Sequence, residues 1–461
     1  MTRGRRDAGV ALAVLAALGA LLPRGALAQD TAVQLSSLGA QPVPWWQRLL
    51  SLGGLAGIVG LSWLLSSKRR AFPTRVVAWG IGLQLVFGLL VLKTQLGQEL
   101  FAMLNEGVVG LLRMTEEGSR FVFGEYLDMK FSFALNVLPT ILFFSSLMAV
   151  LYHLGVMQRI VNGLAWLMQR TMGTSGSETL SAAANIFVGQ TEAPLVVRPY
   201  VSTMTLSELN AVMVGGFATV AGGVLAAYVG MLRERFPDIA GHLIAASVMS
   251  APAALVVAKV MQPETDASKT RGFVRFKVER VDANLIDAAA RGATEGLQLA
   301  LNVGAMLLVF LALVALINFL LGLPVDAWNM LFETDYEPWS LQRILGLVFA
   351  PVAALMGVPL EDCGQVGTLL GEKIVLNEFV AYAHLGDDLA SGASTLHHRS
   401  VVIATYALCG FANFGSIGIQ LGGIGAIAPE RRGDLARLGL RAMIGGTLAA
   451  CMTGTVAGLL V

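Results

Sequence analysis

Long apolar runs dominate this chain. Segments of about 20 residues with few charged side chains recur between residue 48 and residue 460, and an α-helix of that length spans the hydrocarbon core of a bilayer. Of the 461 residues, 55% are apolar and 14% are charged, with a mean hydropathy of +0.68. Soluble domains carry about 25% charged residues. We therefore expect an all-α polytopic membrane protein.

The first residues resemble a secretory signal rather than a part of the fold. Arg3, Arg5 and Arg6 precede an apolar run that ends in Ala26-Leu27-Ala28, the order of a basic region, an apolar region and a small-residue cleavage site. We expect cleavage after Ala28, which makes 1–28 a signal peptide. The alternative is an uncleaved signal anchor. Cleavage would leave the mature N-terminus outside the cytoplasm.

The distribution of basic residues predicts the topology. From an outside N-terminus we expect eight transmembrane helices, at about 48–67, 76–95, 131–153, 206–231, 238–259, 297–321, 399–424 and 438–460. The basic segments 68–75, 259–280 and 428–437 then all fall inside, as the positive-inside rule requires. Both mature termini are predicted to be periplasmic. An amphipathic stretch at 99–114 is expected to lie at the membrane surface.

Two further segments, 173–200 and 360–386, are apolar but interrupted by Gly, Pro, Asn and acidic residues. Each lies between elements already assigned to the same side, so neither crosses the membrane. We expect two re-entrant helical hairpins that enter from opposite faces, with amphipathic interfacial helices beside them.

The two hairpins also predict an internal duplication. Each carries an acid that we expect to be buried, Glu192 or Glu378, and each precedes a Gly-rich span that contains Gly-Phe-Ala, at 216–218 and 410–412. The two spans are predicted to run in opposite directions. Inverted repeats with interrupted helices are typical of secondary transporters, which bind their substrate near the middle of the membrane.

The polar side chains in these segments indicate the kind of ligand. An ionised carboxylate at membrane depth costs about 2.5–3.5 kcal/mol, so the two acids need partners or water. Gln190 and Asn413 both donate and accept hydrogen bonds, and Phe411 offers a flat apolar face. We expect no cationic side chain in the core of the site. The set favours a neutral, hydroxylated, ring-bearing solute over an anion.

A small monovalent cation is also expected. The hairpin backbone broken near Gly189 and Pro194 frees carbonyl groups such as that of Val188, and Asn185 and Thr219 add side-chain oxygens. For Thr219 the alternative is ordinary helix packing, with its hydroxyl bonded back to its own helix.

Other polar residues are expected to have structural roles. Glu372 and Lys373 are interpreted as an ion pair or as a solvated end of the second hairpin. The sequence contains neither HExxH nor GxSxG, and we expect no buried histidine, so we expect no enzyme.

Four segments resemble those of the concentrative nucleoside transporter family: GQTEAPLVVRPY, GGFATVAGGVLAAY, EKIVLNEFVAY and CGFANFGSIGIQLGGIGAIAPERR. The resemblance, to a bacterial member, runs from about residue 45 to residue 461. It implies eight spans, two opposed hairpins, a homotrimer and nucleoside uptake driven by a cation gradient across the inner membrane. It implies no cofactor besides the coupling ion, which is sodium, with a proton as the alternative. The residues do not distinguish pyrimidine from purine nucleosides.

The resemblance also implies site residues. Those expected to bind the nucleoside are Gln190, Thr191, Glu192, Val224, Glu378, Phe411, Asn413 and Ser416. Of these, Gln190, Thr191 and Val224 would face the base. Glu378, Asn413 and Ser416 would hold the ribose hydroxyls, with Glu192 and Phe411 beside the ligand. The expected sodium ligands are Asn185, Val188, Thr219 and Val220.

These expectations divide the chain after the signal peptide into five parts. They are 29–130 (N-terminal spans and interfacial helix), 131–172 (scaffold span and interfacial segment), 173–260 (repeat 1), 261–358 (basic loop, scaffold span and interfacial helix) and 359–461 (repeat 2).

Overall fold

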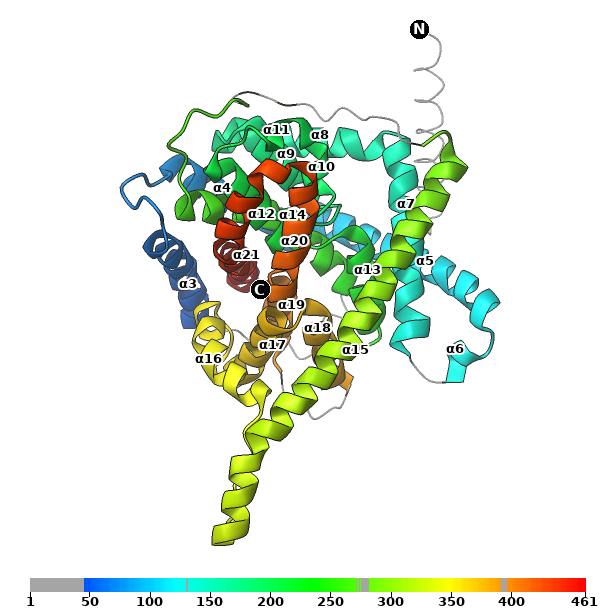
Figure 1. Cartoon of the computed structure of the whole chain (residues 1–461), viewed down its shortest axis with the longest axis vertical. Coiled ribbons are helices and arrows are strands. Elements are labelled where there is room, and N and C mark those ends of the chain that lie inside the picture. Colours follow the sequence, from blue (N-terminus) through cyan, green and yellow to red (C-terminus); the bar gives the residue numbers. More distant parts are fainter. Residues whose placement is uncertain (1–44, 130–131, 271, 273, 275–281, 391–395) are drawn as a thin grey trace.

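The computed structural model describes residues 45–129, 132–270, 272, 274, 282–390 and 396–461, and every regular element in this part of the chain is a helix (Figure 1). The predicted signal peptide lies outside the described residues. The helices are α3 (Trp45–Leu64), α4 (Thr74–Lys93), α5 (Gln95–Phe123), α6 (Tyr126–Met129), η1 (Phe133–Val137), α7 (Leu138–His153), α8 (Val156–Met172), α9 (Gly176–Asn185), α10 (Ala193–Val196), α11 (Arg198–Val201), α12 (Leu206–Ala218), α13 (Gly222–Leu232), α14 (Ile239–Met261), α15 (Leu285–Phe332), α16 (Leu341–Leu355), η2 (Leu360–Asp362), α17 (Cys363–Val375), α18 (Glu378–Ala390), α19 (His398–Leu408), α20 (Phe414–Ile427), η3 (Pro429–Arg431) and α21 (Arg432–Leu460).

The predicted membrane spans are confirmed as helices. Six stretches among the described residues are long and apolar enough to cross a bilayer: Thr74–Lys93, Phe133–His153, Leu206–Leu232, Ile239–Met261, Leu285–Phe332 and Pro429–Leu460. The helix α3 and the interrupted pair α19–α20 complete the eight expected spans. The amphipathic stretch at 99–114 lies within α5, a helix of 29 residues.

The helix α15 is much longer than the predicted span at 297–321. It contains 48 residues and extends about 70 Å at 1.5 Å per residue. It begins where the Asn284 side chain accepts the N–H groups of Ile286 and Asp287, and it ends at Phe332, directly before Glu333, whose φ is 52°. The residues directly before the predicted span, from Leu285 to Gly296, therefore belong to the same helix. Figure 1 shows α15 along one side of the molecule, with its C-terminal end projecting beyond the other helices.

Two spans are interrupted near their middle. α12 ends at Ala218 and α13 begins at Gly222, with extended backbone at Thr219 between them. α19 ends at Leu408 and α20 begins at Phe414. Each interruption leaves backbone carbonyls and N–H groups without helical partners. Such backbone occurs at membrane depth only where protein or water surrounds it.

The repeated Gly-Phe-Ala is not equivalent in the two spans. The first copy, 216–218, is the C-terminal end of α12, whereas the second, 410–412, lies within the break after α19. The two copies contact each other, because a Cβ on Gly410 would lie 2.8 Å from the carbonyl oxygen of Phe217. The two backbones approach so closely that a side chain at Gly410 would not fit between them. The duplication is instead seen in the order of the elements: α7, α8, hairpin, broken span and α14 correspond to α15, α16, hairpin, broken span and α21.

Hairpin 1, formed by α9, α10 and α11, begins and ends on one side of the helix bundle. Gly176, the first residue of α9, donates its N–H to the Thr270 carbonyl at 2.9 Å. At the other end of the hairpin, the Thr205 hydroxyl donates to Glu264 at 2.8 Å. Thr270 and Glu264 follow the C-terminal end of α14. The C-terminal end of α3 lies on the same side, because Ser67, which follows α3, donates its N–H to the carbonyl of Met261, the last residue of α14, at 2.9 Å.

Hairpin 2, formed by α17 and α18, begins and ends on the opposite side. Asp362 at its start accepts the N–H of His397, which follows the hairpin, at 3.0 Å. Close by, Arg399 donates to the hydroxyl of Ser51, near the N-terminus of α3, at 3.1 Å. The two hairpins therefore enter from opposite ends of α3. In Figure 1 the elements of hairpin 1 lie near the top of the helix bundle and those of hairpin 2 in its lower half.

A buried polar network anchors the base of hairpin 1. The Lys259 ammonium of α14 lies 2.6 Å from a carboxylate oxygen of Glu178 and 3.3 Å from one of Glu264. The Glu178 carboxylate accepts the N–H of Ser175 as part of the capping box of α9. Thus one ion pair joins the first helix of the hairpin to α14.

Replacement of Lys259 by Met will destabilise the protein. The substitution leaves Glu178, whose side chain is 1% exposed, as an unpaired buried charge, and such losses cost about 3–5 kcal/mol. Thermal unfolding of the purified protein in detergent measures the change. The matched control is Lys68→Met, because the Lys68 ammonium is exposed and bonded to a hydroxyl. Equal melting temperatures for the two variants would contradict the anchoring role.

Candidate functional site

The tip of hairpin 1 is a turn rather than a helix. α9 ends at Asn185 and α10 begins at Ala193, so the residues from 186 to 192 are outside helices. A carboxylate oxygen of Glu192 accepts the N–H of Gly189 at 2.5 Å and closes the turn. Glu192 is accessible to solvent at the turn, although it lies deep among the helices, so the expectation of a buried acid holds only in part.

A chain of hydrogen bonds joins the tips of the two hairpins. Gln190 donates its Nε2 to the Ser416 hydroxyl at 3.1 Å. The Ser416 N–H donates to Asn413 Oδ1 at 2.8 Å, as the N-cap of α20. Asn413 Nδ2 in turn donates to Glu378 Oε2 at 3.0 Å. All four residues are buried. Four residues predicted separately to bind the nucleoside thus form one connected group.

The sequence analysis missed one member of this group, Gln420. Its side chain is fully buried and donates to Gln190 Oε1 and to the Met213 carbonyl, both at 3.1 Å. A signal was present in the sequence. Asn413, Ser416 and Gln420 are spaced by three and four residues, which places them on one face of α20.

Glycines allow the two repeats to approach closely at the site. A Cβ on Gly216 of α12 would lie 2.8 Å from Gln420 Nε2 and 2.9 Å from Gln190 Cβ. A Cβ on Gly423 would lie 2.7 Å from Thr191 Cγ2. A side chain at Gly216 would push α12 away from hairpin 1 and α20, and a side chain at Gly423 would push α20 away from hairpin 1.

The remaining residues predicted to bind the nucleoside lie around this group. Thr191 is partly buried beside Gly423 in α20. Val224 is buried in α13, and Phe411 is partly buried in the break between α19 and α20. Their roles in binding stay predictions.

The residues predicted to bind sodium lie between the tip of hairpin 1 and the break after α12. Asn185 is 1% exposed, and neither its Oδ1 nor its Nδ2 has a hydrogen-bond partner among the described residues. Val188 is partly buried in the hairpin turn, and Thr219 and Val220 are buried in the break. Gly222 donates its N–H to the Phe187 carbonyl at 3.0 Å, which ties the two segments together.

The unpartnered amide of Asn185 fits a small cation. Buried polar groups are nearly always satisfied, so its Oδ1 is available for a ligand. Thr219 donates its hydroxyl to the Gly215 carbonyl at 2.7 Å, four residues before it in α12. The sequence analysis gave this hydrogen bond to its own helix as the alternative role of the Thr219 hydroxyl. A hydroxyl oxygen that donates in this way still accepts a cation.

Three expectations about charged and titratable side chains were wrong. Lys373 is 1% exposed and is not paired with Glu372, which contacts His384 Nδ1 at 2.8 Å instead. A cationic side chain is therefore buried beside the site. His242, near the start of α14, is also buried and stacks on Phe236 with ring centroids 5.1 Å apart.

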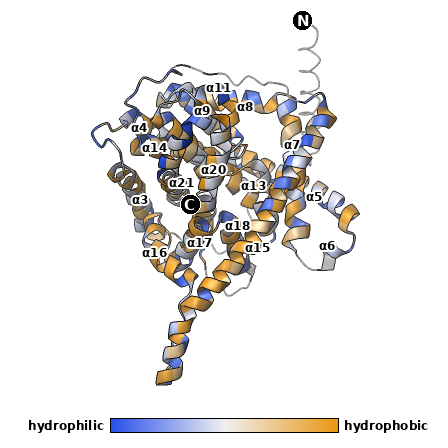
Figure 2. Cartoon of the chain, in the orientation of Figure 1, coloured by the Kyte–Doolittle hydropathy of each residue, from blue (hydrophilic) through white to orange (hydrophobic). Residues whose placement is uncertain are grey.

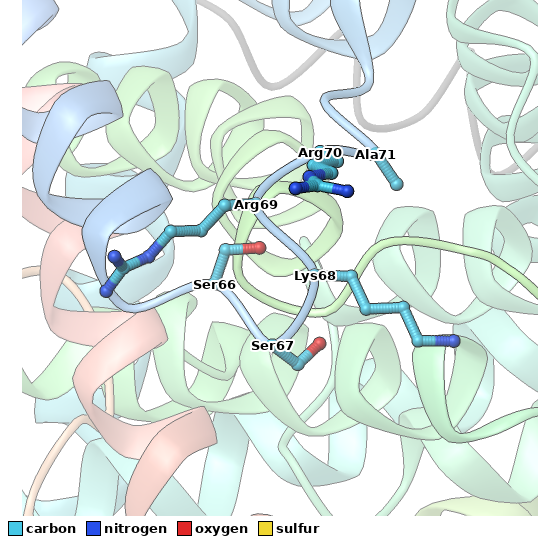
Figure 3. A pocket seen from close by; sticks show the side chains of 6 residues that line it. All are labelled: Ser66, Ser67, Lys68, Arg69, Arg70 and Ala71. Carbon is cyan, nitrogen blue, oxygen red and sulfur yellow. The ribbon is translucent and has the colours of Figure 1, made fainter.

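Two surface cavities lie away from this site. One, of about 680 Å³, is lined by the loop from Ser66 to Ala71 between α3 and α4, where Lys68, Arg69 and Arg70 point in different directions (Figure 3). The other, of about 830 Å³, lies at the base of hairpin 1 beside Glu178 and Lys259. Neither is lined by a residue predicted to bind nucleoside or sodium.

Family models match most of the chain. They are the "Na+ dependent nucleoside transporter N-terminus" over residues 53–126, "Nucleoside recognition" over 134–235, and the "Na+ dependent nucleoside transporter C-terminus" over 242–458.

Curated relatives are similar along almost the whole chain. Sodium/nucleoside cotransporter 1 of Homo sapiens is 45% identical over 426 residues, which is 90% of this chain and 64% of that protein. This chain therefore spans less than two thirds of the length of that relative. The uncharacterized transporter YutK of Bacillus subtilis is 43% identical, with 90% of this chain and 99% of that protein covered.

Solved structures of CNTnw share the fold. The inward-facing, substrate-bound state has a TM-score of 0.81 at 44% identity, covering 89% of this chain and 97% of that chain. An outward-facing state of a CNTnw variant has a TM-score of 0.84 at 43% identity, covering 90% and 98%. With the opposed hairpins and the inverted repeat already described, these matches confirm the resemblance: the chain belongs to the concentrative nucleoside transporter family.

Proposed function

We propose that this protein is a sodium-coupled symporter that imports nucleosides across the inner membrane of a bacterium by alternating access. The observation that carries the proposal is the hydrogen-bonded group of Gln190, Ser416, Asn413 and Glu378, which joins the two hairpin tips. The relatives from Mus musculus and Homo sapiens are named sodium/nucleoside cotransporter 1, and this name supports the substrate and the ion. Proton coupling is the alternative.

The group has the donors and acceptors that a nucleoside needs. Glu378 and Asn413 offer a carboxylate and an amide to vicinal hydroxyls, which suits the ribose. Gln190 and Thr191 lie on hairpin 1 and suit the polar edge of a base. When a nucleoside binds, it replaces hydrogen bonds inside this group, such as that between Gln190 and Ser416. The ligand then becomes the link between the hairpins.

Sodium acts through hairpin 1 in this proposal. The Asn185 amide, the Thr219 hydroxyl and the carbonyl oxygens of Val188 and Val220 surround the ion. Ion binding fixes the turn that carries Gln190 and so raises nucleoside affinity. By linkage, the nucleoside raises sodium affinity by the same factor. One charge that enters at 100 mV contributes about 2.3 kcal/mol, which is about fifty-fold accumulation.

Thr219→Ala will weaken sodium activation more than base selectivity. The variant loses one oxygen near the ion, and a net contribution of about 1 kcal/mol corresponds to about five-fold. The sodium concentration for half-maximal uptake should rise by that factor, while the ratio of uridine to adenosine uptake stays constant. Radiolabelled uptake at graded sodium concentrations measures both. Equal changes in both quantities would place the cation elsewhere.

Alternating access is supported by the related structures, since CNTnw has been solved in inward-facing and outward-facing states. We propose that the hairpins and their broken spans move against a scaffold formed by α7 and α15, which pack on each other. In this division repeat 1 (173–260) and repeat 2 (359–461) carry the site.

A homotrimer explains the surface of α15. Large apolar side chains are exposed along this helix, among them Leu308, Leu316, Phe319 and Leu320. Its projecting half is largely hydrophobic in Figure 2. One face of α15 can contact lipid and another a second copy of the chain. Cross-linking in native membranes tests the trimer.

The experiment that tests the function is uptake by purified protein in liposomes. Sodium, potassium and proton gradients are imposed separately, with uridine and adenosine as substrates. We expect accumulation of chemically unchanged uridine only with inward sodium. Uptake driven by a proton gradient alone would assign the alternative ion. Failure of both nucleosides to enter under any gradient would reject a nucleoside substrate.

A further inference from the structure

Lys373 of α17 is a buried cation without an anionic contact. It is 1% exposed, and its ammonium donates to the Ala407 carbonyl at 2.8 Å. No carboxylate of the described residues lies within 4 Å of it. The buried Lys259, by contrast, has Glu178 at 2.6 Å. Burial of an ammonium without a paired carboxylate is costly, so the protein retains this charge at the expense of stability.

The neighbouring acid does not compensate this charge. Glu372 is fully buried and both of its carboxylate oxygens lie within 2.9 Å of His384 Nδ1. The Lys373 ammonium instead lies toward the break between α19 and α20. That break carries Asn413, which donates a hydrogen bond to Glu378 of the proposed ribose site.

The ammonium lies at the negative end of a half-helix. α19 ends at Leu408, and the carbonyls of its last turn have no partners within the helix. Tyr382 donates its hydroxyl to the Thr405 carbonyl at 2.7 Å, and Lys373 donates to that of Ala407. A cation is stabilised at a helix C-terminus by the helix dipole.

The corresponding place in repeat 1 is the proposed sodium site. In both repeats this place lies between the first helix of the hairpin and the C-terminal end of the first half-helix. The helix pairs are α9 with α12 and α17 with α19, and both pairs are in contact. In repeat 1 the unpartnered Asn185 lies there. In repeat 2 the place holds the Lys373 ammonium.

We propose that Lys373 is a tethered cation that does for hairpin 2 what the coupling ion does for hairpin 1. Its charge holds the end of α19 against α17 and keeps the Glu378 carboxylate oriented toward Asn413. Lys373 is thus a positioning residue for the ribose site, and it does not contact the nucleoside. The two repeats then need only one mobile cation between them. This inference rests on the proposed function.

The test separates charge from hydrogen bonding. Lys373→Met removes both, whereas Lys373→Gln keeps an N–H donor for the Ala407 carbonyl. We expect each variant to raise the KM for uridine at least tenfold. Sodium should still raise the melting temperature of both, because the ion site in repeat 1 is unchanged. The matched control is Lys93→Met, at the exposed end of α4, which should transport normally.

A third variant tests for rescue. Lys373→Ala removes three methylenes and an ammonium, which propylammonium replaces atom for atom. Propylammonium, but not 1-propanol, should restore at least a tenth of wild-type uridine uptake.

Four results would overturn the proposal: a wild-type KM in the Gln variant, loss of sodium-induced stabilisation together with uptake, equal rescue by propanol, or rescue by neither compound. Absence of uridine transport by the wild type would instead reject the proposed function.

Discussion

Glu378→Gln will reduce the kcat/KM of uridine uptake about 100-fold, while the protein reaches the membrane in normal amounts. Glu378 is buried at the start of α18, and its Oε2 accepts a hydrogen bond from Asn413 at 3.0 Å. The amide has the shape of the carboxylate but loses the charge and one acceptor. A hydrogen bond to a charged group contributes about 1.5–3 kcal/mol, and about 2.7 kcal/mol corresponds to 100-fold.

The control for this variant is Glu361→Gln. Glu361 lies at the start of the same hairpin, but its side chain is 84% exposed. Its replacement should leave uptake unchanged. Both variants are assayed as initial rates of uridine uptake, normalised to protein in the membrane. A second substrate, 2′,3′-dideoxyuridine, lacks both ribose hydroxyls of this contact and should be affected less by Glu378→Gln. Normal uridine uptake by Glu378→Gln would remove the ribose assignment.

Asn185→Ala will strongly weaken sodium activation without destabilising the sodium-free protein. Since neither polar atom of the buried Asn185 amide has a partner in the described part of the chain, its removal in the absence of the ion breaks no hydrogen bond there. In the presence of sodium the variant lacks a ligand. The sodium concentration for half-maximal uptake should rise at least tenfold. The stabilisation by sodium, which follows the ratio of ion concentration to Kd, should disappear.

Asn210→Ala is the matched control for this pair of effects. Asn210 is buried in α12 as well, but its Nδ2 donates to the Ala258 carbonyl at 3.2 Å, on a helix that carries no site residue. The control should lower the melting temperature with and without sodium, and it should leave sodium activation intact. The opposite pattern, with Asn185→Ala melting lower in sodium-free buffer and still activated by sodium, would exclude a cation site at Asn185.

Local features of the sequence were sufficient to predict the spans and the hairpins. Bilayer thickness fixes the length of an apolar helix, and basic residues fix the side of each loop. Both constraints act within about 20 residues, so they can be read along the chain. The hairpin acids and Gln190 could also be identified from the sequence, because polar residues are rare in apolar segments.

Contacts between distant segments could not be predicted in this way. Glu192 and Glu378 look alike in the sequence, yet the former is exposed at a turn and the latter is buried. The Gly-Phe-Ala copies suggested equivalent positions, but they are two backbones in contact.

The sequence by itself determined an all-α membrane fold with two opposed hairpins, because those features follow from the balance of apolar and polar residues in each segment. Only the tertiary structure decided which polar groups meet. It brought Gln190 to Ser416 across 226 positions, and it turned Lys373 away from Glu372 toward the end of α19. The physical reason is that a buried polar group takes whichever partner the packing of the helices supplies.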